Sequence, residues 1–212
     1  MSVKLVSITD PVIEGIHSAE ELITYCARVS NPNNQLNTET SSKLLKYCLT
    51  HRHWSIFEQV SCAFEIKTSR AIAAQILRHR SFSFQEFSQR YSTATELEEI
   101  EWRKQGSTNR QVGDDVVNLL PDVAVQLAKI QQDSLLLYNN LIDSGIAREC
   151  ARMVLPLNTS TTIYMNGTVR SWLHYLEIRC KNDTQKEHRV IADEIKNIFR
   201  QTFPNISEAM GW

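Results

Sequence analysis

A dense group of hydrogen-bond donors lies in the stretch RHRSFSFQEFSQRYS, residues 78–92. It contains three arginines, one histidine and three phenylalanines, separated by serine, glutamine and glutamate. Guanidinium groups suit two-point contacts with phosphate, and aromatic rings can stack on a flat heterocycle. The stretch therefore predicts either a site for a flat, anionic ligand or a solvated polar surface.

Gln75 and Arg78 extend this group toward the N-terminus. They are three residues apart in a segment of helical periodicity, so they share one helix face and reach the helix end together. The carboxamide offers one donor and one acceptor to a base-like edge, and the guanidinium suits a phosphate. The alternative is an exposed basic helix end, where cations interact favourably with the helix dipole.

Two other functions compete for the same residues. Ser88 could be a hydrolase nucleophile with His79 as its base, although no Gly-x-Ser-x-Gly element surrounds it. Arginines interleaved with phenylalanines also occur in proteins that bind single-stranded nucleic acid. The net charge of −1 and the acidic run from Glu96 to Glu101 oppose this second alternative.

Metal, disulfide and membrane chemistry are not indicated. The five cysteines are odd in number and lack metal-ligand spacing, so reduced thiols are expected. His51 and His53 flank a cationic residue, Arg52, which disfavours a metal site. No apolar run approaches the roughly 20 residues of a membrane span, and we expect no signal peptide at the N-terminus. We expect a cytoplasmic protein whose partners are small molecules, not membranes or nucleic acid.

The elements that must position the donors begin with a strand of alternating apolar residues. Ser18 opens a Ser-x-x-Glu capping box, and Ser69 is a second candidate helix cap. A later alternating segment should turn one face inward, formed by Val60, Cys62, Phe64 and Ile66. The expected elements are a strand at 3–9, helices at 18–29 and about 40–51, a strand at 59–67 and a helix at 69–79.

The second half of the chain is mainly helical. Residues 93–115 are polar and acidic and are expected to form a surface excursion. A strongly helical pattern then runs from Pro121 to about Leu155, with a break at Ser144-Gly145. The remaining expected elements are a strand at 161–165, a turn at Asn166-Gly167, a helix at 169–180 and a last helix at 184–203 that stops at Pro204.

The composition fits one globular domain of 212 residues, with 42% hydrophobic and 22% charged residues. No repeat, linker or low-complexity run divides the chain. We therefore expect a single α+β domain over residues 1–212, with a mixed sheet and several helices, including a long central helix.

The stretch RHRSFSFQEFSQRYS resembles the signature of the flavin-dependent thymidylate synthases, in which Arg-His-Arg is followed after seven residues by a serine, here Ser88. The resemblance continues through Arg90 and Tyr91. Three further segments resemble elements of that family in the same order. They are HWSIFE at 53–58, RECARMVLPLN at 148–158 and RSWLHYLEIR at 170–179.

This resemblance implies the same fold and a reductive methylation of dUMP to dTMP. It implies 5,10-methylenetetrahydrofolate as the one-carbon donor, NADPH as the reductant of a bound FAD, and a homotetramer with shared sites. Arg179 would be the catalytic cation that favours ionisation of the uracil ring. The nucleotide contacts implied by matching position are Gln75, Arg78, Glu86, Ser88, Arg90, Arg152 and Arg179. The FAD contacts implied in the same way are Ser55, Arg78, His79, Arg80, Glu86, Arg170 and His174.

The residues themselves agree with flavin chemistry. No cysteine follows a proline, as the nucleophile of the other kind of thymidylate synthase does. No Gly-x-Gly-x-x-Gly occurs, so side chains must hold the flavin. Arg170 and Arg179 are nine residues apart and point roughly 180° apart on a helix, which suits two different pockets. The chain departs from the resembled family at Thr168 and His174, where some members of that family have asparagine.

Overall fold

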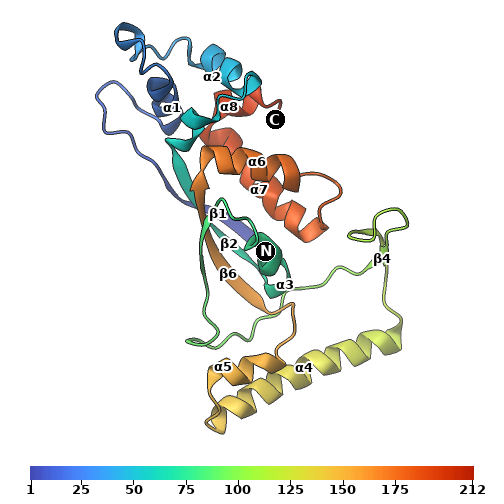
Figure 1. Ribbon diagram of the computed structural model, residues 1–212. Helices are drawn as coiled ribbons and strands as arrows, with labels where there is room; N and C mark the ends of the chain where they lie inside the picture. Colours follow the sequence, from blue (N-terminus) through green and yellow to red (C-terminus); the bar gives the residue numbers. More distant parts are fainter.

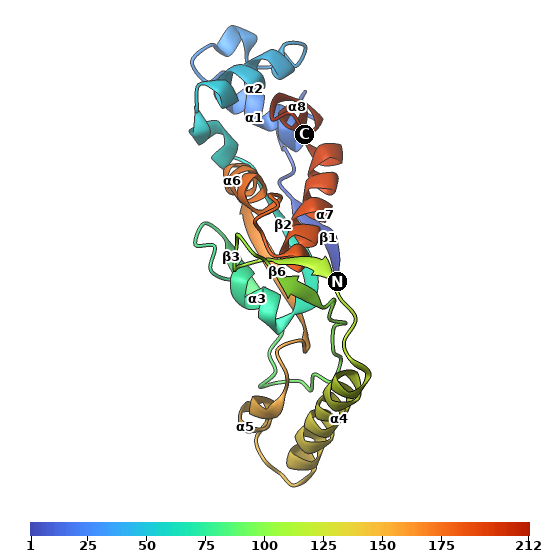
Figure 2. The same cartoon turned by 90° about the vertical axis from the view of Figure 1, so that its right-hand side faces the viewer.

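The structure, a computed structural model, describes all 212 residues, and the chain is elongated in two perpendicular views (Figure 1, Figure 2). Four strands form its main sheet, and two short strands form a separate hairpin. The strands are β1 (Ser2–Ile8), β2 (Ser61–Ser69), β3 (Ser83–Glu86), β4 (Arg103–Gln105), β5 (Gly113–Val116) and β6 (Ser160–Thr168). The α-helices are α1 (Ala19–Ala27), α2 (Ser41–Thr50), α3 (Arg70–Ile76), α4 (Pro121–Asp143), α5 (Arg148–Ala151), α6 (Val169–Arg179), α7 (Lys186–Thr202) and α8 (Pro204–Ala209). Short 3-10 helices are η1 (Pro32–Asn34), η2 (Trp54–Glu58) and η3 (Arg152–Val154).

The main sheet has the strand order β1-β2-β6-β3, and every neighbouring pair is antiparallel. The expected α+β class is confirmed, but the expected mixed sheet is wrong. Apolar alternation identifies a strand without giving its direction. Strand β3 was not predicted; it lies within the donor-rich stretch and pairs with β6, with Ser83 opposite Asn166 and Glu86 opposite Ile163.

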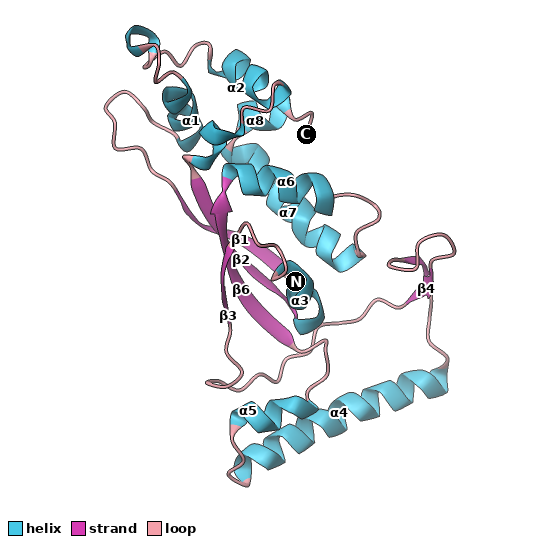
Figure 3. Cartoon of the chain, viewed as in Figure 1, coloured by secondary structure: helices cyan, strands magenta, loops and turns pink.

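The core lies between this sheet and helices α6 and α7, which cover one of its faces (Figure 3). The predicted inward face of β2 is confirmed, since Val60, Cys62, Phe64 and Ile66 are all buried. Trp172 of α6 packs edge-on against Phe64, with ring centroids 4.8 Å apart, and its indole N–H donates to the carbonyl of Cys62 at 3.1 Å. These contacts fix α6 over the sheet.

Both predicted helix caps are present. The hydroxyl of Ser18 accepts from the backbone N–H of Glu21 at 3.1 Å, and Ser69 accepts from the N–H of Ile72 at 3.4 Å. Thr168 caps α6 in the same way, by accepting from Ser171 at 3.3 Å. Strands β2 and β6 therefore lead directly into α3 and α6, and these two helices carry four of the predicted ligand contacts, Gln75, Arg170, His174 and Arg179.

The predicted turn at Asn166-Gly167 is wrong, and two other expectations for the second half are incomplete. Asn166 and Gly167 continue β6 opposite Ala63 and Cys62 and do not form a turn. Pro204 ends one helix but also begins α8, where its missing N–H removes no intrahelical bond. The polar excursion contains a hairpin, because β4 pairs with β5.

The long helix α4 is present but is not central in this chain. It lies beside α5, at the opposite end of the molecule from α1, α2 and α8 (Figure 1). The predicted break is confirmed, since α4 ends at Asp143 and Gly145 has a φ of +81°. Tyr138 is the buried residue of α4. None of the chain's helices combines the length and apolarity needed to cross a membrane, and all five thiols are free.

Candidate functional site

The Arg78-His79-Arg80 sequence lies in the turn after α3, because that helix ends at Ile76. Arg78 and Arg80 are exposed, whereas His79 is half-buried. Nε2 of His79 accepts a hydrogen bond of 2.9 Å from Nε of Arg179, the last residue of α6. The predicted catalytic cation is therefore held against a predicted flavin contact.

His79 is neutral near pH 7. Burial, followed by the charges of Arg179 and Arg78, lowers its pKa from 6.5 to about 4. Because Nε2 accepts from Arg179, the ring proton resides on Nδ1, which remains available to a ligand. A hydrolase needs a histidine base bonded to its serine. The bond from Arg179 takes the acceptor nitrogen instead, which opposes the alternative with Ser88 as nucleophile.

Phe82 anchors the donor-rich stretch to the sheet. Its ring packs edge-on against Trp172, with centroids 4.6 Å apart, and covers the backbone of β6 at Gly167. A Cβ atom at Gly167 would lie within 2.5 Å of Cε1 of Phe82. The hydroxyl of Ser171 also donates to the carbonyl of Ser81 at 3.0 Å. Position 167 therefore accepts only glycine while the ring stays in place.

Glu86, at the end of β3, is held by two donors from neighbouring elements. Nη1 of Arg70 donates to its Oε1 at 2.6 Å, and the hydroxyl of Thr161 donates to the same oxygen at 3.0 Å. The other carboxylate oxygen has no hydrogen-bond partner within the chain and can receive a donor from a ligand. Sequence reasoning missed Arg70, whose only signal is its place directly after the helix cap.

Ser88 and Arg90 lie in the exposed loop after β3, but Gln89 between them is only 5% exposed. Gln89 points inward, and its buried Nε2 has no hydrogen-bond partner. It lines a cavity of about 300 Å³ together with Arg152. The other lining residues are Arg70, Met153, Leu155, Pro156, Leu157 and Thr159. This cavity offers donors and cations without a carboxylate in its lining, which suits an anionic group.

Gln75 extends from α3 toward the start of α7. Its Nε2 donates to Oε1 of Gln185 at 2.7 Å, and its Oε1 lies 3.4 Å from Nδ1 of His188. His188 is fully buried, and its Nε2 lies 3.0 Å from the hydroxyl of Tyr175. The sequence could not reveal these partners of Gln75, which lie more than a hundred residues away along the chain.

The remaining predicted flavin contacts gather near η2. Arg170 forms an ion pair with Glu58. His174 packs against Trp54, with ring centroids 4.6 Å apart. Ser55 is exposed on the same 3-10 helix.

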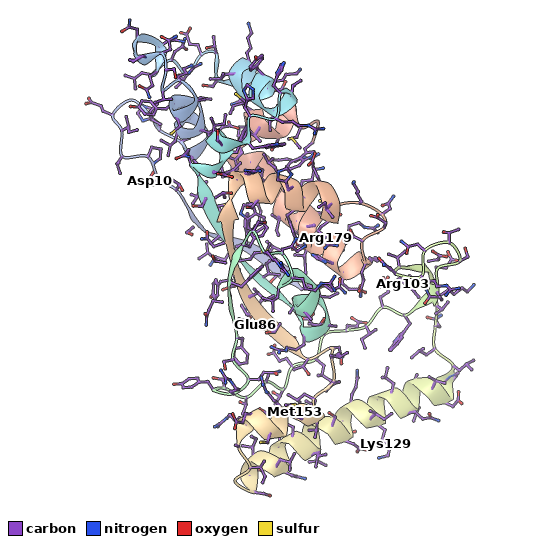
Figure 4. All side chains as sticks on the ribbon, in the orientation of Figure 1. Asp10, Glu86, Arg103, Lys129, Met153 and Arg179 are labelled. Carbon is purple, nitrogen blue, oxygen red and sulfur yellow. The ribbon has the colours of Figure 1, made fainter.

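The predicted ligand contacts thus form three groups in the chain. One group surrounds the His79–Arg179 bond, the second surrounds the Arg152 cavity, and the third lies along η2 and α6. Figure 4 labels Glu86 by the sheet and Arg179 on the helices. Arg170 and Arg179 contact different elements, in agreement with their predicted opposite directions. The ligand-binding roles themselves stay predictions.

Comparison with known sequences places these residues in a wider context. Residues 11–205 match the family model described as thymidylate synthase complementing protein. A probable flavin-dependent thymidylate synthase of Paramecium bursaria Chlorella virus 1 is 53% identical over the whole of both chains. A flavin-dependent thymidylate synthase of Synechocystis sp. is 50% identical, also over the whole of both chains.

A solved structure shares the fold. It is a UMP/dUMP methylase, PolB, from Streptomyces cacaoi, bound with 5-Br dUMP. The TM-score is 0.81 at 27% sequence identity, and the match covers 99% of this chain and 94% of that chain. The similarity therefore includes the sheet, the helices over it and the α4–α5 extension.

Proposed function

The chain belongs to the flavin-dependent thymidylate synthase family, and from that premise we propose that it converts dUMP to dTMP with a bound FAD. 5,10-Methylenetetrahydrofolate supplies a methylene group, which becomes a methyl group when it gains a hydride. NADPH is the source of those two electrons, so the folate leaves as tetrahydrofolate and NADP⁺ is formed. The net reaction also consumes one proton.

The observation that carries this proposal is the partner of Arg179. Its guanidinium is held by a neutral imidazole, whereas Arg70, Arg103 and Arg170 are held by carboxylates. A carboxylate partner balances the charge of an arginine, but His79 leaves it uncompensated. A fixed, uncompensated cation stabilises negative charge that develops on a nearby ring. This is what uracil activation without an enzyme nucleophile requires.

The donor set on the chain fits FAD. Arg78 and Arg80 are exposed cations with no ion pair within the chain, and they suit the diphosphate of the cofactor. The Nδ1–H of His79 and the side chains of Ser55, Arg170 and His174 supply further donors, and Glu86 offers an acceptor. When bound, FAD supplies the hydride that NADPH provides. These residues would hold the cofactor.

The donor set of the Arg152 cavity fits the nucleotide. Gln89 contributes a buried N–H with no partner, and such a group is costly unless a ligand or water satisfies it. Ser88 and Arg90 flank it on the exposed loop. We infer that a phosphorylated ligand contacts this loop and Arg152, with Gln75, Arg78 and Arg179 binding the rest of the nucleotide.

We infer that the chain assembles with further copies of itself, and α4 supplies a surface for assembly. Val123, Ile130 and Leu137 are 41%, 65% and 47% exposed and recur every seven residues along it. This spacing places them in one stripe, as in helices that pair with another helix. An apolar stripe of this length is unfavourable in water. We infer a homotetramer in which a second copy covers the stripe and contributes residues to the site.

The absorption spectrum and one substitution test this function. Purified protein should show the absorbance band of oxidised flavin, which NADPH should bleach. Arg179→Ala should lower dTMP formation by roughly a hundredfold or more, because it removes the cation from the reacting ring. Its flavin content should be nearly normal, and Arg200→Ala, an exposed arginine on α7, is the matched control. Protein that takes up no FAD, or normal turnover in Arg179→Ala, would contradict the proposal.

A further inference from the structure

The carboxamide of Gln75 is one member of a continuous chain of hydrogen bonds. Its Nε2 donates to Oε1 of Gln185 at 2.7 Å, and Nε2 of Gln185 donates to Oε2 of Glu187 at 2.9 Å. On the other side, Oε1 of Gln75 faces Nδ1 of His188, whose Nε2 faces the hydroxyl of Tyr175. A side-chain amide can place either its oxygen or its NH₂ group toward a given neighbour. Something must therefore determine which group donates in each of these hydrogen bonds.

That cause lies at the Glu187 end. An ionised carboxylate can only accept, so Gln185 must present its NH₂ group to Glu187 and its oxygen to Gln75. Gln75 must then donate to Gln185 and present its own oxygen to His188. His188 must in turn donate from Nδ1 and accept at Nε2 from the hydroxyl of Tyr175. The ionised carboxylate of Glu187 therefore fixes the donor and acceptor roles of four further side chains.

Glu187 and Tyr175, at the two ends of this series of hydrogen bonds, are held in the required protonation states. Nη2 of Arg103 donates to Glu187 at 2.5 Å. Burial raises the pKa of Glu187, but hydrogen bonds from Arg103, the backbone and Gln185 outweigh it, and the net pKa lies below 4.5. Burial raises the pKa of Tyr175, so its hydroxyl keeps the proton that it donates. Burial, followed by the charge of Arg179, lowers the pKa of His188 to about 3, so its ring is neutral.

Arg103 comes from strand β4 of the hairpin and is labelled in Figure 4. It also contacts Glu101 at 2.8 Å, and Glu101 accepts from Lys186 at 2.7 Å. Glu101 belongs to the same ion cluster but makes no bond to Gln185. The cluster thus contains one carboxylate that orients the amide chain and one that does not.

We propose that Glu187 and His188 are positioning residues that lock the carboxamide of Gln75 in one orientation and thereby make the site select uracil over cytosine. The proposal rests on the proposed function, in which Gln75 contacts the nucleotide. A locked carboxamide presents its remaining N–H and its oxygen in a fixed order. Uracil offers a carbonyl beside an N–H, whereas cytosine offers an amino group beside an unprotonated nitrogen, so the two edges need opposite orders. An amide free to turn over would accept both bases.

Glu187→Gln should reverse the donor and acceptor roles along the whole series of hydrogen bonds from Gln185 to Tyr175. Arg103 can only donate, so the new carboxamide must keep its oxygen toward Arg103 and present its NH₂ group to Gln185. Gln185 and Gln75 then turn over, and His188 changes from the Nδ1–H to the Nε2–H tautomer. Glu101→Gln is the matched control, because it removes the same charge from the same cluster without touching the amide chain.

Two measurements test this on the FAD-loaded enzyme. The first is the affinity for dUMP and for dCMP by calorimetry, which should favour dUMP in the wild type and in Glu101→Gln. In Glu187→Gln the ratio of the two affinities should fall by roughly tenfold or more, since one hydrogen bond is worth about that factor. The second is the ¹⁵N spectrum of labelled histidine, which should show the Nδ1–H tautomer of His188 in the wild type and the Nε2–H tautomer in Glu187→Gln.

The outcomes separate this inference from the proposed function. Wild-type protein that binds neither FAD nor dUMP would refute the function itself. A wild type that prefers dUMP, combined with an unchanged ratio in Glu187→Gln, would overturn the positioning role alone. An Nε2–H tautomer of His188 in the wild type would overturn it as well. Thermal unfolding of both variants verifies that each one is folded.

Discussion

Replacing Gly167 with alanine tests how the donor-rich stretch is fixed to the sheet. The new Cβ would lie within 2.5 Å of Cε1 of Phe82, and closer still to Cδ1. Carbon atoms in contact are normally 3.5 to 4.0 Å apart, so the ring must move by about 1 Å or more. Phe82 cannot move freely, because Trp172 and Tyr175 pack against its ring with centroids 4.6 and 5.8 Å away.

Two opposing effects decide how much Gly167→Ala changes the stability of the protein. Alanine restricts the unfolded chain and would by itself stabilise the protein by about 0.4–1 kcal/mol. Overpacking of a tight site costs about 1–3 kcal/mol, so steric conflict should win. For a chain of this size the melting temperature should fall by roughly 2 to 10 °C. The segment from Arg78 to Ser88 should shift with Phe82, and the affinity for FAD should weaken.

A double-mutant cycle separates this mechanism from general damage. Phe82→Ala removes the ring atoms that the new methyl group would meet, so the double variant should lose less stability than the sum of the two single variants. Asn166→Ala, an exposed neighbour in the same strand, is the control. The reasoning is wrong if Gly167→Ala melts at the wild-type temperature, or if the two substitutions are simply additive.

Two further predictions concern acid stability and assembly. The pKa of His188 is about 3 in the folded chain against an ordinary 6.5, so its contribution to stability is present above pH 6.5 and lost as the pH falls toward 3. Between pH 7 and pH 5 this amounts to about 2 kcal/mol, measured by urea unfolding, and His188→Gln should remove that part of the slope; an unchanged slope would contradict it. Ile130→Glu should dissociate the oligomer in sedimentation and lower activity, whereas Gln132→Glu, an exposed polar position on the same helix, should do neither. A wild-type monomer would refute the role of α4.

Local features of the fold were predictable from sequence because their causes are local. Ser18 and Ser69 cap helices through bonds to residues three positions away, and the pattern of β2 needs only alternation. The order of the strands was not predictable in this way, since β3 is short and acquires its structure from pairing with β6. Its sequence, SFQE, alternates too briefly to separate a strand from a loop.

Gly167 shows the same limit for a single residue. After Asn166, a glycine is a typical turn signal, and the sequence offers no reason to prefer another interpretation. The actual reason is the ring of Phe82, which comes from eighty-five positions earlier in the chain. A glycine that makes room for a distant side chain and a glycine that makes a turn are identical in sequence.

The candidate site was predictable in its residue types but not in the partners that give those residues their roles. The motif marked Gln75, Arg78 and Arg179 as ligand contacts, yet it said nothing of Gln185, which holds the first of them through a side-chain amide. Such partners come from helices separated by long stretches of chain. Only the packing of α3, α6 and α7 brings them together.

The contacting residues also distinguish the arginines from one another by charge balance, a difference that the sequence alone does not show. Arg170 is paired with Glu58 at a half-exposed position, where an ion pair contributes little energy and its charge is already balanced. Such a side chain can bind and orient a ligand, but its field on a reacting ring is weak. Arg179 is fixed by a neutral imidazole in a half-buried position, so its full charge acts where water screens it less. The difference between a binding arginine and an activating arginine therefore lies in the residue that each one contacts.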